Sequence, residues 1–247
     1  MSKRDLIAIG RSSIDLYSQD IGVPFKEISG FNAFVGGSPL NISVGCSRLG
    51  LKSTLLTAVG KDKVGEFILN FLNKENVNTE FIPIKENARS SAVLLGIEPP
   101  DKFPLVFYRD NAADTQINID DVNNANIANH KVLLVNGTAL NKEPSRGATI
   151  HAIEIAKKNS VSVVMDLDFR ADQWEDYRSF GRVVRSIISK VDIAIGTEEE
   201  VLASMFKDSS QVTIKHQQIS SPEIKGNLNK SIQGLIKLGT SILIVKR

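Results

Sequence analysis

The sequence predicts an α/β fold with a mostly parallel sheet flanked by helices. Short, β-branched apolar runs alternate with helical patterns over most of the 247 residues, which is typical of successive βαβ units. The composition, 42% hydrophobic and 23% charged, is that of an ordinary globular protein and excludes fibrous and disordered classes. A chain of this length can bury one large core, so we expect a single α/β domain over residues 1–247.

Six short apolar segments are the candidate strands of this sheet: residues 6–9, 53–59, 132–135, 161–165, 192–195 and 241–245. They end in Gly, Asp, Asn or Lys, residue types that suit the ligand-binding edge of an α/β sheet. Functional side chains are therefore expected directly after these strands.

Capping residues mark four helix starts. They are Ser38 before Pro39, Asp62, the pair Pro144-Ser145 and Thr197, which has Glu200 three positions later. Ser and Asp are good N-caps, proline suits the first helical position, and Thr with a following Glu forms a capping box. Gly50 is expected to end the first of these helices as its C′ glycine.

Two regions interrupt the alternation. Residues 90–98 and 103–109 are strand-like runs joined by residues 99–102, the pattern of a hairpin inserted between βαβ units. Residues 25–35 are also irregular and strand-prone. We expect both inserts, at about 16–36 and 90–110, to form a small β lid, whereas the polar segment 207–229 is expected to be a loop.

Charge and cysteine content limit the partners and the compartment. The net charge is +2, without the basic runs that nucleic acids or membrane surfaces attract. The first apolar run, residues 6–9, is too short for a signal peptide or a membrane helix. The single cysteine, Cys46, fits a reducing compartment. We expect a cytoplasmic protein whose partner is a small molecule, with neither nucleic acid nor membrane.

Common nucleotide and metal motifs do not occur in the sequence. It contains neither the P-loop pattern nor G-x-G-x-x-G. The three histidines are far apart and there is no C-x-x-C, which argues against zinc. No direct protein site for a metal is predicted, and nucleotide binding would need another device.

The strongest local motif is Gly36-Gly37-Ser38-Pro39-Leu40-Asn41. Two glycines allow a ligand to approach the backbone closely, and they lead into a helix whose first N–H groups are free. Asn41 can donate to and accept from vicinal hydroxyls. The alternative is a tight turn followed by an ordinary helix cap.

Charged side chains follow three further segments. Asp166-Leu167-Asp168-Phe169-Arg170 ends a strand of buried type and could hold hydrated magnesium and an anionic substrate, or be a salt-bridged strand end. Asp15 follows the first strand and can accept hydrogen bonds from sugar hydroxyls. Arg109 ends the lid and could bind a carboxylate, or be an exposed edge-strand charge. Glu200 is explained by its capping box unless the neighbouring motifs add to it.

Taken in order, these motifs resemble the ribokinase/PfkB family of sugar kinases, which transfer phosphate from ATP to a hydroxymethyl group on a ribokinase-like α/β fold with a β lid. Within the family, the runs 10–17, 36–41, 107–109, 166–170 and 196–200 are most similar to the branch that phosphorylates 5-dehydro-2-deoxygluconate in myo-inositol breakdown. The resemblance covers the whole chain and implies ATP and Mg²⁺ as cofactors. It also implies a homodimer through the lid.

The resemblance implies a role for each matching residue. Asp15, Gly36, Gly37 and Asn41 match the positions that bind the substrate's hydroxyls, and Arg109 and Arg170 match those that meet the acid end of a sugar acid. The nucleotide and magnesium side is matched by three acidic residues: Asp166, Asp168 and Glu200. Two arginines directed at one cleft also suit a planar carboxylate better than a neutral sugar.

The sequence departs from the family pattern in two places. Asp168 and Thr197 stand where the family commonly has asparagine, and the G-A-G-D motif that carries the family's base aspartate does not occur before Arg247. From this we expect the C-terminal part of the fold to be missing, the nucleotide pocket to be incomplete, no catalytic base within the chain and little or no turnover. The alternatives are a 2-keto-3-deoxygluconate or fructokinase-like kinase, and a non-catalytic protein that binds a sugar acid.

Overall fold

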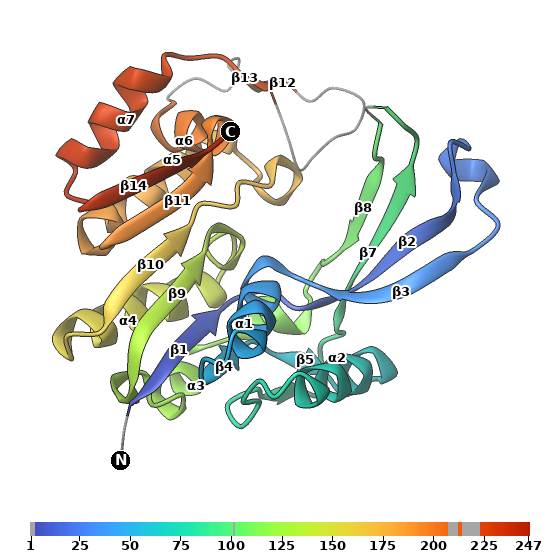
Figure 1. The fold of residues 1–247 in the computed structure, drawn as a ribbon, viewed down its shortest axis with the longest axis horizontal. Coiled ribbons are helices and arrows are strands. Elements are labelled where there is room, and N and C mark those ends of the chain that lie inside the picture. The colour runs from blue at the N-terminus through green and yellow to red at the C-terminus, as the bar shows by residue number, and fades with distance from the viewer. Residues whose placement is uncertain (1–2, 101, 207–211, 214–222) are drawn as a thin grey trace.

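A computed structural model of the protein describes residues 3–100, 102–206, 212–213 and 223–247. Its centre is a six-stranded sheet in the order β14-β11-β10-β9-β1-β4 (Figure 1), in which every neighbouring pair is parallel. The strands are β1 (Arg4–Ile9), β4 (Ser53–Leu56), β9 (His130–Asn136), β10 (Ser162–Asp166), β11 (Ile193–Thr197) and β14 (Ile242–Lys246). Each of the six predicted strands forms one strand of this sheet, so the predicted fold class is confirmed.

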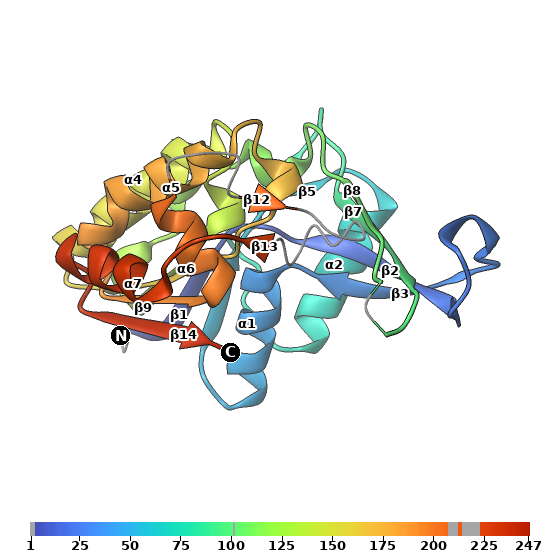
Figure 2. The ribbon, with the colours of Figure 1, turned by 90° about the horizontal axis from the view of Figure 1, so that it is seen from above.

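Helices cover both faces of this sheet, as Figure 2 shows. Along β1, Leu6 and Ala8 join the core beneath α1 (Ser38–Arg48) and α2 (Lys63–Lys74), whereas Ile7 and Ile9 join the core on the opposite face. The second core includes side chains of α3 (Ile119–Asn124), α4 (Ser145–Lys158), α5 (Tyr177–Ile187), α6 (Glu198–Met205) and α7 (Leu228–Lys237). Since side chains alternate along a strand, a strand covered on both faces is apolar throughout.

The lid is a separate four-stranded sheet in the order β3-β2-β7-β8 that extends from one side of the α/β body (Figure 1). Its strands are β2 (Ser13–Ile21), β3 (Phe31–Gly36), β7 (Ser91–Ile97) and β8 (Leu105–Tyr108). β7 and β8 form the predicted antiparallel hairpin, and β2 joins it by a parallel pairing with β7. The two predicted inserts therefore do form one sheet.

Short elements complete the described chain. They are the strands β5 (Val59–Gly60), β6 (Ile84–Lys85), β12 (Val212–Thr213) and β13 (Glu223–Ile224), with the 3₁₀ turns η1 (Phe25–Glu27), η2 (Ala113–Gln116), η3 (Ile127–Asn129), η4 (Gly137–Ala139), η5 (Ala171–Gln173) and η6 (Ile188–Lys190). The predicted loop over 207–229 lies mostly outside the described residues.

Three of the four helix starts are as predicted. Asp62 accepts a hydrogen bond from the N–H of Gly65, α4 begins at Ser145, and Thr197 and Glu200 form the capping box of α6. The prediction for Ser38 is wrong: Gly37, at φ 114°, is the N-cap, and Ser38 is already helical. The Ser38 hydroxyl instead donates to Asp166 at 2.5 Å. It therefore connects the start of α1 to the end of β10 and does not cap its own helix.

The lid begins slightly earlier than predicted. Asp15 was expected to follow the first strand, as it does, and the lid was expected to begin at about residue 16. The structure places Asp15 inside β2, which begins at Ser13 and pairs with β3 and β7. The chain thus enters the lid almost directly from β1, through Gly10 at φ 144°, because that conformation turns the backbone sharply and favours glycine.

Candidate functional site

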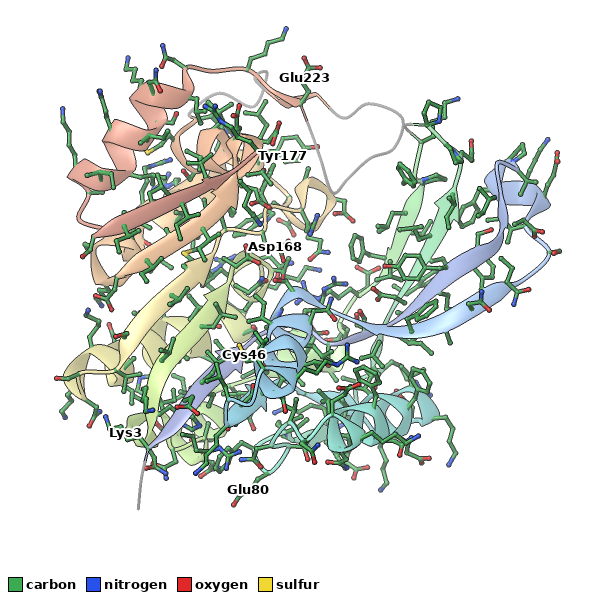
Figure 3. All side chains as sticks on the ribbon, viewed as in Figure 1. Lys3, Cys46, Glu80, Asp168, Tyr177 and Glu223 are labelled. Atoms are coloured by element: carbon green, nitrogen blue, oxygen red, sulfur yellow. The ribbon has the colours of Figure 1, made fainter. Side chains whose placement is uncertain are left out.

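The predicted site residues lie where the carboxyl ends of the parallel strands meet the lid. Asp166 ends β10 and Thr197 ends β11. In the lid, Asp15 lies within β2, and Arg109 directly follows β8. Figure 3 shows Asp168 at the junction between the six-stranded sheet and the lid. This edge of an α/β sheet is where ligands generally bind.

The two glycines of the Gly-Gly motif are required by their neighbours. A Cβ on Gly36 would lie 1.9 Å from Oδ2 of Asp15, and one on Gly37 would lie 2.3 Å from the backbone oxygen of Arg11. Both contacts are far too short for any side chain. Glycine at these two positions therefore allows the end of β3 to lie close to Asp15 of β2 and to the residues that precede β2. Asn41 lies in the first turn of α1 and is exposed. The motif is therefore a tight turn and helix start, as the alternative had it, and it is also the wall behind Asp15.

Asp15 is a partly buried carboxylate held in a fixed position. The Ser13 hydroxyl donates to its Oδ1 at 2.6 Å, and burial raises the pKa of Asp15 although Arg11 and Ser13 oppose that effect. A carboxylate that has lost water in this way is suited to accept hydrogen bonds from ligand hydroxyls.

Asp166 connects the end of β10 to three other elements. Its Oδ2 accepts from Ser38 of α1 and from Asn136 of β9, the latter at 3.3 Å, and its Oδ1 lies 3.8 Å from Nζ of Lys246. That Oδ1 is buried and has no hydrogen-bond partner. Burial, followed by repulsion from Asp168, raises the pKa of Asp166. A bound cation would relieve both effects.

Asp168 and Arg170 form an ion pair at 2.7 Å. Asp168 is 2% exposed and has φ 36°, a left-handed conformation that aspartate adopts more readily than most residues. The Thr138 hydroxyl lies 3.4 Å from its Oδ2. The end of β10 is thus a salt-bridged strand end, as the alternative interpretation has it. The substrate role of Arg170 stays a prediction.

Glu200 has a second feature besides its capping box. Its carboxylate accepts from the Thr197 N–H at 2.8 Å, which accounts for its position at the start of α6. Burial raises its pKa to about 7, and Asp168 and Asp166 add to the increase. The three acidic residues predicted for the magnesium side thus influence one another electrostatically, which the capping box alone does not require.

Arg109 is buried and engaged rather than exposed. Its Nε and Nη2 donate to Oδ2 of Asp114 at 2.8 and 2.6 Å, Nη1 donates to Gln173, and Nη2 also donates to the backbone oxygen of Thr138. At 6% exposure, the alternative of an exposed edge-strand charge is wrong. The prediction that Arg109 meets a substrate carboxylate stays a prediction.

A cavity of about 270 Å³ lies beside this ion pair and is lined by residues of both parts of the molecule, among them Phe107 of the lid and Asp172 of η5. Three of the lining residues carry buried polar atoms without a hydrogen-bond partner: Asn141, Gln173 and Trp174. Burial raises the pKa of Asp172 to about 6.

Sequence reasoning assigned no role to two residues that the structure brings to the site. Arg11 is 7% exposed beside Asp15, and Asp172 is close enough to Arg170, Arg11 and Arg109 for all three to lower its pKa. The only available signal for Arg11 was its position after Gly10 at the end of the first strand, where functional side chains were expected.

Among the described residues, no group of three or more His, Cys, Asp or Glu side chains is arranged to hold a metal ion. None of the helices in the described ranges has the length and apolar character needed to cross a membrane.

Comparison with known proteins gives the family. Residues 3–246 match the model of the pfkB family carbohydrate kinases. A 5-dehydro-2-deoxygluconokinase of Bacillus velezensis is 35% identical over 215 residues, covering 86% of this chain and 65% of the relative. One of Halalkalibacterium halodurans is 38% identical over 224 residues, covering 89% of this chain and 68% of the relative. The chain thus spans about two thirds of the length of these relatives.

Solved structures agree with that result. A sugar kinase of Pyrococcus horikoshii, described as uncharacterized, superposes with a TM-score of 0.75 at 31% identity, covering 81% of this chain and 64% of that protein. A fructokinase of Halothermothrix orenii gives a TM-score of 0.80 at 23% identity, covering 98% of this chain and 79% of that one, which shows the shared fold. The chain belongs to the PfkB family of carbohydrate kinases.

Proposed function

We propose that the protein is part of an ATP-dependent sugar-acid kinase, and that its substrate is 5-dehydro-2-deoxygluconate, phosphorylated on the primary hydroxyl. The observation that carries the acid specificity is the convergence of the Arg11, Arg109 and Arg170 side chains on the site beside Asp15. Asp114 pairs with Arg109 and Asp168 with Arg170, so the charge left to compensate is that of Arg11. A ligand carboxylate would compensate it, whereas a neutral sugar would not. The names of the relatives support the same substrate.

In this proposal Asp15 accepts hydrogen bonds from the sugar hydroxyls, and Gly36, Gly37 and Asn41 form the wall and helix start around it. The support is that the backbone at Gly36 lies against the Asp15 carboxylate, and the backbone at Gly37 lies against the backbone oxygen of Arg11.

Mg²⁺ and ATP are proposed to lie near Asp166, Asp168 and Glu200. Oδ1 of Asp166 is buried without a hydrogen-bond partner, and the pKa values of Asp166 and Glu200 are raised; both observations fit a site that receives positive charge. Carboxylates that hold the water shell of Mg²⁺ serve this purpose without direct coordination. A bound Mg²⁺ would neutralise charge on the transferred phosphate.

We assign no catalytic base to a residue of this chain. Asp166 is engaged by Ser38 and Asn136, and Asp168 is engaged by Arg170. The expectation of little or no turnover therefore stays a prediction that the assay below tests directly.

The test combines binding and turnover. Calorimetric titration should show that the chain binds 5-dehydro-2-deoxygluconate more tightly than D-fructose, and D15N should weaken both. ADP release in a coupled assay with Mg²⁺ and ATP then separates a kinase from a protein that only binds the acid. Tighter binding of 2-keto-3-deoxygluconate favours the first alternative, and equal binding of fructose refutes the acid specificity.

Two finer expectations belong to the same proposal. We propose a cytoplasmic location, for which the single cysteine is the support. We also propose a homodimer through the lid, since Val106 and Tyr108, 40% and 61% exposed, present apolar surface on strand β8. Sedimentation of V106E/Y108E against the unmodified chain tests it.

A further inference from the structure

Arg11 is a buried cation with unused hydrogen-bonding capacity. It is 7% exposed, and its Nε is buried without a hydrogen-bond partner. Its Nη1 makes only a long contact, 3.4 Å, with the Ser13 hydroxyl. In the part of the chain that the structure describes, no carboxylate forms an ion pair with it. Burying an arginine in this way is costly unless a partner arrives.

The neighbouring guanidinium groups differ from that of Arg11 because each has a carboxylate partner. Arg109 has Asp114 at 2.6 Å and Arg170 has Asp168 at 2.7 Å. Arg11 experiences the attraction of Asp15 and Asp168 only at longer range, opposed by repulsion from Arg109 and Arg170, and burial lowers its pKa. It is thus the arginine of this cluster whose charge the protein itself leaves least compensated.

The position of Arg11 directs it toward the substrate side of the lid. Its guanidinium carbon lies 5.1 Å from the centre of the Phe107 ring. Val93 is the direct strand partner of both Asp15 and Phe107, so all three side chains project from the same face of the lid. Phe107 also lines the cavity shared with Asp172 of the α/β body. Arg11 therefore lies between the lid and the body, on the side where Asp15 would hold the sugar.

We propose that Arg11 binds the carboxylate of the sugar-acid substrate, and that Arg109 holds the lid in position through Asp114. The inference rests on the proposed function. A guanidinium stacked on an aromatic ring keeps its edge free, and the adjacent Nε–H and Nη–H groups match a planar carboxylate with two parallel hydrogen bonds. Asp15 is not the hydrogen-bonded partner of the Arg11 guanidinium, because its Oδ1 accepts from Ser13 and its Oδ2 packs against Gly36.

The decisive experiment measures the preference for an acid over a neutral analogue. The ligands are 5-dehydro-2-deoxygluconate and its methyl ester, titrated calorimetrically into the unmodified chain, R11M and a control. R11M should bind the acid roughly ten- to a hundred-fold more weakly, the range expected for a lost charge-assisted hydrogen-bonded pair, whereas its binding of the ester should weaken much less. The control is R182M, because Arg182 is an exposed arginine on α5.

A purely structural role for Arg11 makes the opposite predictions. As a ligand-binding residue, Arg11 destabilises the free protein, so R11M without ligand should unfold at the same temperature or a higher one. If R11M unfolds at a lower temperature and weakens the acid and the ester equally, the proposal is wrong. R11K, which keeps the charge without the bidentate edge, should recover only part of the preference for the acid.

Failure of this inference can be told apart from failure of the proposed function. If the unmodified chain binds neither ligand, or binds the ester as tightly as the acid, the proposed sugar-acid function fails and this inference fails with it. If the unmodified chain prefers the acid and R11M keeps that preference, only the role of Arg11 is refuted. In that case loss of the preference in R170M would assign the carboxylate to Arg170.

Discussion

Replacing Arg109 with methionine should destabilise the protein strongly, because it leaves a buried carboxylate without a partner. The Arg109 and Asp114 side chains are 5% and 1% exposed. Oδ1 of Asp114 already lacks a hydrogen bond, and Oδ2 receives its two bonds from Arg109. Methionine keeps most of the aliphatic volume but supplies none of these donors.

The magnitude follows from the burial of the pair. Removing one member of a buried ion pair costs about 3–5 kcal/mol, and the lost bonds to Gln173 and Thr138 place R109M toward the upper part of that range. For a chain of this size, that corresponds to a fall in Tm of roughly 6–20 °C. The double variant R109M/D114L removes both charges and should recover to within about 2 kcal/mol of the unmodified protein.

Urea unfolding followed by tryptophan fluorescence measures these differences. Trp174 is the single tryptophan, it is 4% exposed, and it adjoins Gln173, a partner of Arg109. A double-mutant cycle over R109M, D114L and the double variant gives the coupling free energy, for which we expect at least about 2 kcal/mol. A loss below about 1 kcal/mol in R109M, or a double variant no more stable than R109M, would refute a structural ion pair at this position.

Two further predictions concern the acidic side and the Gly-Gly motif. The pKa of Glu200 rises from 4.5 to about 7 on folding. Its contribution to stability is therefore present below pH 4.5 and is lost as the pH rises through about 7. E200Q keeps the capping acceptor but does not titrate, so in unfolding experiments between pH 4 and 8 it should remove up to about 3 kcal/mol of that decline. G36A should abolish sugar-acid binding in calorimetry because its Cβ would displace Asp15, whereas G45A, which has open space around its Cβ, should bind normally and unfold at the same or a slightly higher temperature; normal binding by G36A would contradict the role of Asp15.

The sequence was sufficient to predict the main sheet but not the internal partners of the site. All six strands could be located because each is a short, continuous apolar run. Helices on both faces of the sheet require such a run at strands like β10, and the run at β14 is apolar although Ile242 and Ile244 are exposed. The start of the lid was harder to locate because β2 mixes polar and apolar residues and has a half-exposed pattern. The pairing of Arg109 with Asp114 joins the end of β8 to η2, and that of Ser38 with Asp166 joins α1 to β10. Such contacts depend on tertiary placement, for which one sequence carries no local signal.

The parallel pairing of β2 with β7 has a consequence for the order of folding. Parallel neighbours cannot be joined by a tight turn, and here α1, β4 and α2 lie between them along the chain. Closing so long a loop costs entropy before β2 can pair with β7, whereas the antiparallel pairs β2–β3 and β7–β8 are local along the chain. We therefore expect the α/β elements between β2 and β7 to fold before Ser13 pairs with Ser91. On this basis the β2–β7 pairing should be the last pairing of the lid to form, and losing it would open the lid while the core remains intact.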